Sequence, residues 1–167
     1  KQRGMLFKGI LFAGLMIDGD DVKVIEFNTR FGDPEAQILL PLLQGDITAL
    51  FDSAARGNLR GMSSPVIAHE TAVHVVMVSE GYPETKGTGM RLGEEIHFSG
   101  NVNDNQGALV FISGAQKKGG IWVNSGGRVL GVTAFGGTTE EARVKAYEAI
   151  GSIHFQGAHW RRDIGKS

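Results

Sequence analysis

Glycine is the residue that most constrains how this chain can fold. There are 25 glycines among 167 residues, and they are dispersed between short apolar runs instead of forming low-complexity tracts. This distribution is typical of turns in a strand-rich fold, because glycine adopts backbone conformations that other residues avoid. Hydrophobic residues make up 41% and charged residues 21% of the chain, which suffices for a real core. We expect one globular domain, or one and a fraction.

Charge and residue usage exclude several classes of function. The formal net charge is -1, and the basic pair Arg161-Arg162 is followed directly by Asp163. The chain therefore gives no electrostatic reason to expect a nucleic-acid or membrane partner. Cysteine is absent, which excludes disulfides and thiolate metal sites and fits a reducing compartment. No apolar run approaches the roughly 20 residues that span a bilayer, so a cytoplasmic location is the expectation.

The first part of the chain predicts a β-hairpin. The apolar run 9–17 and the run 22–27 are rich in strand-forming residues, and Asp-Gly-Asp-Asp at 18–21 supplies a turn between them.

Two helices are expected after the hairpin. Asp33 can cap the first, with Pro34 at its first position, and Gly45 suits its C-terminal end. Asp46 can cap the second helix, which Gly57 would end.

The pattern changes from helical to β after the small, polar stretch 58–65. A domain boundary is placed there, giving residues 1–60 and 66–167 as the two expected domains. One helix should close the second domain, because Thr138 and Glu141 are spaced as a capping box. The strands expected before it are 72–79, 95–98, 109–113, 121–124 and 128–134.

The most informative segment for function is the end of the second hairpin strand. Strand side chains alternate between faces, so Val22, Val24, Glu26 and Asn28 are predicted to share one face, which turns polar where the strand ends. Glu26 and Asn28 would be about 6.6 Å apart at Cα, and hard oxygen donors of this kind suit Mg²⁺ with phosphate ligands. The alternative is an ordinary half-exposed strand that carries Glu and Asn, since the spacing alone is common.

The residues that follow add a possible anion site. Arg30 offers a planar, permanently charged fork for a phosphate or carboxylate, and Gly32 permits a tight approach to the next helix. Asp33 and Glu35 could hold a substrate ammonium group or orient Arg30. Their other interpretation is ordinary helix capping and compensation of the helix dipole.

A second candidate segment is Ser-Gly-Gly-Arg at 125–128. One interpretation is a turn between two strands, in which positive φ explains Gly126 and Gly127. The other is a nest of backbone N–H groups that, with Arg128, binds a phosphate.

Five stretches of the sequence carry a family resemblance. The stretches are 12–17, 24–37, 81–83, 125–134 and 162–165. In this order they resemble segments of glycinamide ribonucleotide synthetases, which are ATP-grasp enzymes, and the resemblance extends over nearly the whole chain. Glu-Phe-Asn alone would indicate only some ATP-grasp protein, whereas its continuation into Arg-Phe-Gly-Asp-Pro-Glu and the later Ser-Gly-Gly-Arg indicate this family.

The resemblance implies an α+β fold and a ligase. The fold would be the C-terminal part of an ATP-grasp subdomain, made of antiparallel strands and helices, followed by a small β-rich, hybrid-motif-like domain with one closing helix. The activity would join glycine to 5-phosphoribosylamine through a glycyl phosphate, with ATP as co-substrate, giving glycinamide ribonucleotide, ADP and phosphate in de novo purine biosynthesis. The family also implies a monomeric full-length protein, whose N-terminal part this chain lacks, so the chain alone is expected to be inactive.

The resemblance also assigns roles to residues. Glu26 and Asn28 would bind Mg²⁺ or Mn²⁺, and Phe27 and Asn28 would contact the nucleotide. Arg30 and Asp33 would act in catalysis. The expected substrate-binding residues are Gly32, Glu35, Gly126, Gly127 and Arg128.

Two stretches depart from the family pattern, and two rival functions stay open. Residues 111–115 read Phe-Ile-Ser-Gly-Ala where the family commonly shows Phe-His-Ala-Gly-Thr, and residues 85–93 are also atypical. The rivals are a non-catalytic β-rich binding or accessory module and another ATP-grasp ligase or carboxylase. A biotin or lipoyl carrier is disfavoured, because no Met-Lys-Met sequence is present.

Overall fold

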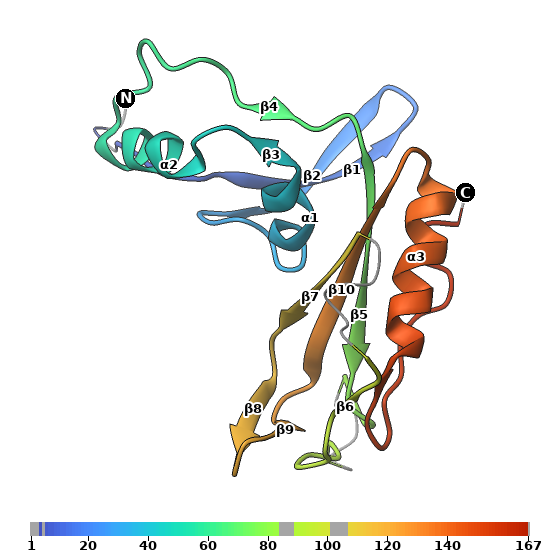
Figure 1. Cartoon of the computed structure of the whole chain (residues 1–167). Helices are drawn as coiled ribbons and strands as arrows, with labels where there is room; N and C mark the ends of the chain where they lie inside the picture. Colours follow the sequence, from blue (N-terminus) through green and yellow to red (C-terminus); the bar gives the residue numbers. More distant parts are fainter. Residues whose placement is uncertain (1–3, 5, 84–88, 101–106, 167) are drawn as a thin grey trace. The chain divides into compact units, whose positions relative to one another are not determined.

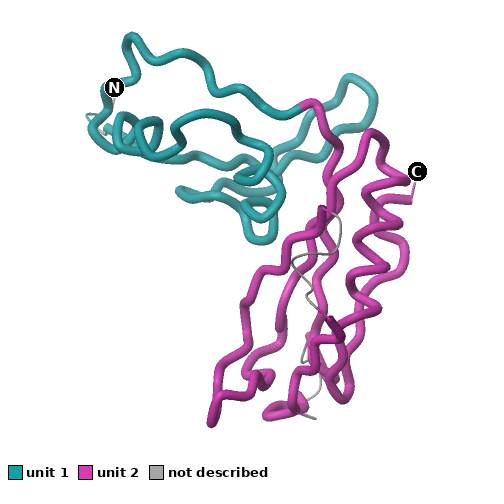
Figure 2. The backbone as a smooth tube through the Cα atoms, in the orientation of Figure 1, with its two compact units in different colours: residues 1–68 teal, residues 69–167 magenta. Residues whose placement is uncertain are grey.

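The computed structural model describes residues 4, 6–83, 89–100 and 107–166. The chain divides into two compact units, Lys1–Ala68 and His69–Ser167 (Figure 2). The assignment of 1–60 and 66–167 to two domains of a longer enzyme stays a prediction.

The first unit opens with the expected β-hairpin (Figure 1). Strands β1 (Phe12–Asp18) and β2 (Asp21–Asn28) pair antiparallel, and Asp18 lies opposite Asp21 across the turn. Gly19 in that turn has a φ of 58°, a left-handed conformation that glycine adopts without steric cost.

A β-bulge changes which residues of the hairpin share a face. Leu15 pairs with Val24 but Gly14 pairs with Glu26, so Ile25 is an extra residue in β2. Cross-strand partners share a face, and neighbouring β1 residues point to opposite faces. Val24 therefore lies on the face opposite to that of Glu26. The prediction that the two valines share a face with Glu26 and Asn28 was wrong, because regular alternation does not continue through a bulge.

Helix α1 (Ala36–Leu42) begins later than expected. Its N-cap is Glu35, which makes no side-chain capping bond, whereas Asp33 Oδ1 accepts a hydrogen bond from Gln37 Nε2 at 3.2 Å. The prediction that Asp33 caps this helix was therefore wrong. The chain reaches the helix through a turn over 33–35, in which the Ala36 N–H donates to the Gly32 carbonyl.

The second helix follows its sequence signals closely. In α2 (Ile47–Arg56), Asp46 is the N-cap and accepts a hydrogen bond from the Ala49 N–H at 2.8 Å. Gly57 is the C-cap, with a φ of 72°. Both confirm the expected caps. Gly45 does not end α1, whose C-cap is Leu43. The unit also contains the short antiparallel pair β3 (Leu43–Gln44) and β4 (Val66–Ile67).

The second unit is built on a three-stranded antiparallel sheet and one helix (Figure 1). The strand order is β5 (Thr71–Val78), β10 (Arg128–Gly136) and β7 (Ala108–Ile112), and α3 (Thr139–Gly151) packs against the sheet. Thr138 caps α3 through the Glu141 N–H, as its sequence predicts.

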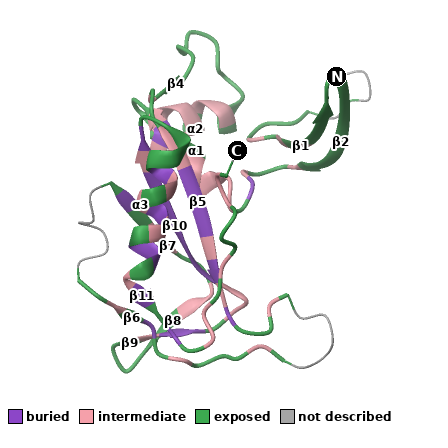
Figure 3. Cartoon of the chain, turned by 90° about the vertical axis from the view of Figure 1, so that its right-hand side faces the viewer, coloured by how far each residue is buried: buried purple, intermediate pink, exposed green. Residues whose placement is uncertain are grey.

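The core of this unit lies between the sheet and α3, where buried residues concentrate in Figure 3. The largest fully buried apolar side chains are Met77, Leu130, Ile150, Ile153, Val75, Val129 and Val132. Full burial of one such side chain contributes about 1.5–3 kcal/mol to the stability of the fold.

Two more strand pairs complete the second unit. Strand β6 (His97–Phe98) pairs with β11 (Ile153–His154), and β8 (Ala115–Lys118) pairs with β9 (Ile121–Asn124). Every strand pairing described is antiparallel, which agrees with the expected α+β class.

Candidate functional site

Glu26 and Asn28 come together on one face at the end of β2. Asn28 Nδ2 donates a hydrogen bond to Glu26 Oε1 at 3.0 Å. Their cross-strand partners are Gly14 and Phe12, so both side chains lie on the same face of the hairpin. Glu26 is exposed and Asn28 half-buried, so the predicted pair presents a carboxylate and an amide to solvent. Phe27, between them, points to the opposite face and is 62% exposed.

The segment after β2 is anchored to helix α2. The Phe31 and Phe51 rings are 5.7 Å apart between centroids and inclined at 52°, a favourable geometry for an aromatic pair. Arg30 is exposed, and its Nη1 donates to the Phe31 carbonyl at 2.7 Å. The aromatic contact thus fixes the backbone that carries Arg30.

Gly32 and Glu35 also come together. Gly32 is buried, and the Glu35 side chain folds back over it. A Cβ atom at Gly32 would lie 2.7 Å from Glu35 Cδ and would clash with Oε2. Gly32 therefore makes the space in which the Glu35 carboxylate lies, which is the tight approach that its sequence position suggested.

The Ser-Gly-Gly-Arg turn lies in the second unit and differs from both sequence interpretations. Neither Gly126 nor Gly127 has a positive φ, so the explanation by left-handed backbone was wrong. The alternation of right- and left-handed residues that a nest requires is also missing at these two positions.

Close packing explains these glycines instead. A Cβ at Gly127 would lie 2.7 Å from Tyr82 Cε2 and 3.0 Å from Met90 Sδ. A Cβ at Gly114 would lie 2.8 Å from the Gly126 Cα and 2.6 Å from the Arg128 carbonyl oxygen. The backbones at Gly114 and Gly126 therefore approach too closely for a side chain at position 114, and a Cβ at Gly126 would lie 3.2 Å from the Gly114 Cα. Gly114 belongs to the atypical 111–115 stretch; of the other atypical stretch, residues 85–88 lie outside the described part.

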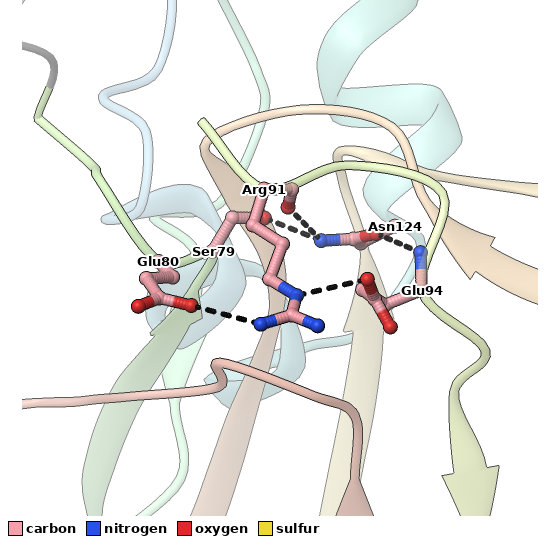
Figure 4. A network of polar contacts seen from close by, with 5 residues as sticks. All are labelled: Ser79, Glu80, Arg91, Glu94 and Asn124. Carbon is pink, nitrogen blue, oxygen red and sulfur yellow. Dashed lines mark hydrogen bonds and ion pairs between the residues drawn. The ribbon is translucent and has the colours of Figure 1, made fainter. Parts of the chain in front are cut away.

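A polar network next to this turn was not expected from the sequence (Figure 4). Asn124 Nδ2 donates to Ser79 Oγ at 2.8 Å and to the Arg91 carbonyl at 2.7 Å, while its Oδ1 accepts from the Glu94 N–H at 2.7 Å. Ser79 Oγ in turn donates to the Gly126 carbonyl at 2.9 Å. Ser79 and Asn124 end predicted strands, and nothing in their local sequence distinguishes them from surface polar residues.

An ion-pair cluster is connected to the network through Arg91. Arg91 Nε donates to Glu94 Oε1 at 2.9 Å, and Arg91 Nη1 lies 3.5 Å from Glu80 Oε2. The hydrogen bond to Glu94 is the main reason that the Arg91 pKa is raised. Because the Arg91 carbonyl also contacts Asn124, this cluster is part of the same structural support.

Few candidate metal ligands lie together in the described part of the chain. Within the described ranges, no group of three or more His, Asp or Glu side chains is placed to hold a metal ion. Glu26 and Asn28 supply hard oxygen donors but would need further ligands from elsewhere, such as phosphate and water.

No helix in the described part of the chain is long and apolar enough to cross a membrane.

Two family models match the chain. The phosphoribosylglycinamide synthetase C domain matches residues 72–167, and the ATP-grasp (A) domain of the same family matches residues 1–36. The chain belongs to the phosphoribosylglycinamide synthetase family. This confirms the resemblance that the sequence motifs carry.

Curated and solved relatives agree with this assignment. The chain is 42% identical to a phosphoribosylamine–glycine ligase of Chlorobaculum tepidum and 43% identical to one of Brucella melitensis, in each case over 97% of this chain. A crystal structure of phosphoribosylamine–glycine ligase from Thermotoga maritima superposes with a TM-score of 0.79 at 35% identity, covering 97% of this chain. The fold class is thereby confirmed. The chain spans 37% of the length of the two curated relatives and 38% of the solved one.

Proposed function

We propose that this chain forms the C-terminal portion of a phosphoribosylamine–glycine ligase. The reaction would activate glycine as glycyl phosphate with ATP, after which the amine of 5-phosphoribosylamine displaces phosphate to give glycinamide ribonucleotide. The observation that carries the proposal is the Glu26–Asn28 pair, held together at the end of β2 within the part that matches the ATP-grasp domain. Relatives named for this activity cover nearly the whole chain.

Glu26 and Asn28 are proposed to hold Mg²⁺ or Mn²⁺. Their carboxylate and amide oxygens are the donor type that such a cation takes, and both side chains lie on one face. The bound cation would neutralise charge on the transferring phosphoryl group. Phe27 and Asn28 are proposed to contact the nucleotide.

Three residues after β2 are proposed to act on the substrates. One nitrogen of Arg30 is engaged by the Phe31 carbonyl, which orients the guanidinium; its remaining N–H donors would stabilise the phosphoryl group electrostatically. Asp33 is proposed to assist Arg30. Glu35, seated over Gly32, would hold the glycine or amine substrate.

In the second unit, Gly126, Gly127 and Arg128 are proposed to contribute to binding of the ribose phosphate. Because the glycines are not left-handed, Arg128 would supply the main attraction there. We also propose that residues 1–60 belong to the ATP-grasp domain and 66–167 to the C-terminal domain of a cytoplasmic, monomeric enzyme.

A chimaeric enzyme tests this function. Replacing the matching segment of the Chlorobaculum tepidum ligase by this chain should retain ATP-dependent formation of glycinamide ribonucleotide. Glu26→Gln in the chimaera should lower kcat at least 100-fold, a loss in the range reported when one electrostatic contact to a transition state is removed. Asp20→Asn, an exposed acid in the hairpin turn, is the matched control and should leave kcat unchanged.

Two results would contradict the proposal. One is a Glu26→Gln chimaera as active as the unsubstituted one. The other is substantial ligation by the 167-residue chain alone, because the proposal requires the remainder of the enzyme for catalysis.

A further inference from the structure

We infer that Gly14 is a positioning residue for Glu26. This inference rests on the proposed role of Glu26 as a metal ligand. The missing side chain at Gly14 leaves the space on β1 across which the Glu26 side chain lies, and from there the Glu26 carboxylate accepts its hydrogen bond from Asn28.

The contact between the two residues is close. Gly14 pairs directly with Glu26, and a Cβ at position 14 would lie 3.1 Å from Glu26 Cγ. The next nearest atoms to that Cβ are the backbone N and O of Glu26, both at 3.8 Å. Since carbon atoms pack best about 3.5–4.0 Å apart, a Cβ at position 14 would require the Glu26 side chain to give way by a few tenths of an ångström.

The backbone gives no other reason for a glycine at this position. Gly14 lies inside β1 and is not among the glycines with a positive φ. Any L-residue could adopt its conformation, and β-branched residues would favour the strand more. Glycine weakens a strand interior, so its presence here is best explained by what it leaves open, namely the position of the Glu26 side chain.

The bulge brings these two residues together. Without the bulge, regular pairing continued from Leu15–Val24 would place Ile25 opposite Gly14 and Glu26 opposite Ala13. Ala13 is on the other face of the hairpin, so Glu26 would point the wrong way. Gly14 and the bulge therefore act together. The bulge determines the face of the hairpin on which Glu26 lies, and Gly14 leaves space on that face for the Glu26 side chain.

The test uses the whole chain with Gly14→Val, the milder Gly14→Ala, and Ala13→Val as the matched control on the opposite face. The first measurement, without metal and at one pH, is the position of the Asn28 side-chain amide signals by NMR. Glu26→Ala defines where these signals lie without the hydrogen bond. Gly14→Val should move them toward the Glu26→Ala position, Gly14→Ala should move them less, and Ala13→Val should leave them in place.

The second measurement is Mn²⁺ affinity by electron paramagnetic resonance. Gly14→Val should weaken binding by roughly tenfold, as is typical when the support of a metal ligand is lost, and Ala13→Val should change it less than about twofold. A merely structural role would not separate these variants, because both place valine in the same strand.

The outcomes distinguish this inference from the proposed function. If the parent chain binds no Mn²⁺ but Gly14→Val still moves the Asn28 signals, the positioning role stands and the metal-ligand role fails. If the Asn28 signals stay at their parent positions in folded Gly14→Val, the positioning role is overturned. Should Gly14→Val lose the hairpin signals, Gly14→Ala decides in the same way.

Discussion

Asn124 donates a hydrogen bond from Nδ2 to Ser79 Oγ at 2.8 Å, and both residues are almost completely closed to solvent. The same amide contacts the backbone at Arg91 and Glu94. One side chain thus joins the end of β9, the residue after β5 and the loop before β6.

Asn124→Ala should destabilise the second unit by about 2–4 kcal/mol. The substitution removes the bonds of Asn124 to Ser79 Oγ, the Arg91 carbonyl and the Glu94 N–H. The bond to Ser79 is buried and the other two are part-buried, and loss of a partner in a buried site costs about 1–3 kcal/mol. Both tryptophans of the chain, Trp122 and Trp160, lie in this unit, so their fluorescence during urea unfolding reports on it. Gln116→Ala, on exposed β8, should change stability by less than about 0.5 kcal/mol. Equal losses in the two variants would contradict the prediction.

Gly114→Ala should destabilise the same unit by about 1–3 kcal/mol, because its Cβ meets backbone atoms, which cannot rotate away. Gly151→Ala is the control: it lies at the end of α3 with open space around it and no positive φ. Alanine there should stabilise by about 0.5–1 kcal/mol. Opposite signs in urea unfolding are expected, and a stabilising Gly114→Ala would refute the close backbone crossing.

Asp163 should titrate near pH 2. Its carboxylate accepts hydrogen bonds from Arg161 Nε at 3.0 Å and from Arg161 Nη2 at 2.5 Å. These bonds, together with one from the backbone of Asp163 itself, lower its pKa from 3.8 to about 2. The stabilisation is therefore complete above about pH 3.8 and is lost as the pH falls through 2. Arg161→Gln should raise the Asp163 pKa toward 3.8, measured by carboxyl ¹³C NMR. An unchanged midpoint would show that Arg161 is not the cause.

Asp46→Ala should loosen the first turn of α2, since Asp46 Oδ1 accepts from the Ala49 N–H. Loss of such a cap costs about 1 kcal/mol, and the Ala49 amide should exchange with solvent faster by roughly fivefold. Thr48→Ala, an exposed substitution in the same turn, should not accelerate that exchange. If both variants exchange alike, the side-chain cap contributes nothing.

Local sequence signals predicted the larger elements well. Helix caps such as Asp46 and Thr138 can be predicted from a few adjacent residues, and the long strands β5 and β10 can be predicted because they are apolar runs. A strand of two residues is too short to show a periodicity in the sequence, and four strands in the described part of the chain are of this length: β3, β4, β6 and β11. Of these, only β6 lies within a strand that was expected, at 95–98. The polar strand β8 was missed because Gln-Lys-Lys resembles a loop.

The candidate site was predictable in composition and only in part in geometry. Glu26 and Asn28 stand two apart in the sequence, so their shared face followed from strand alternation. The bulge at Ile25 did not, because it appears only when β2 is aligned with β1. Likewise, the sequence around Gly126 is that of a turn, and the close packing that explains this glycine involves Gly114, which is distant in the sequence.

The enclosure of Asn124 also bears on how this protein ages. Asparagine followed by serine is a thermolabile pair that deamidates when the serine backbone nitrogen attacks the side-chain carbonyl carbon. In the fold, the Ser125 N–H donates to the Gly114 carbonyl at 2.7 Å, and the Asn124 amide is held at both ends. Deamidation at Asn124 should therefore proceed only from molecules in which this region has opened. The rate of deamidation during storage would then report how often the region opens.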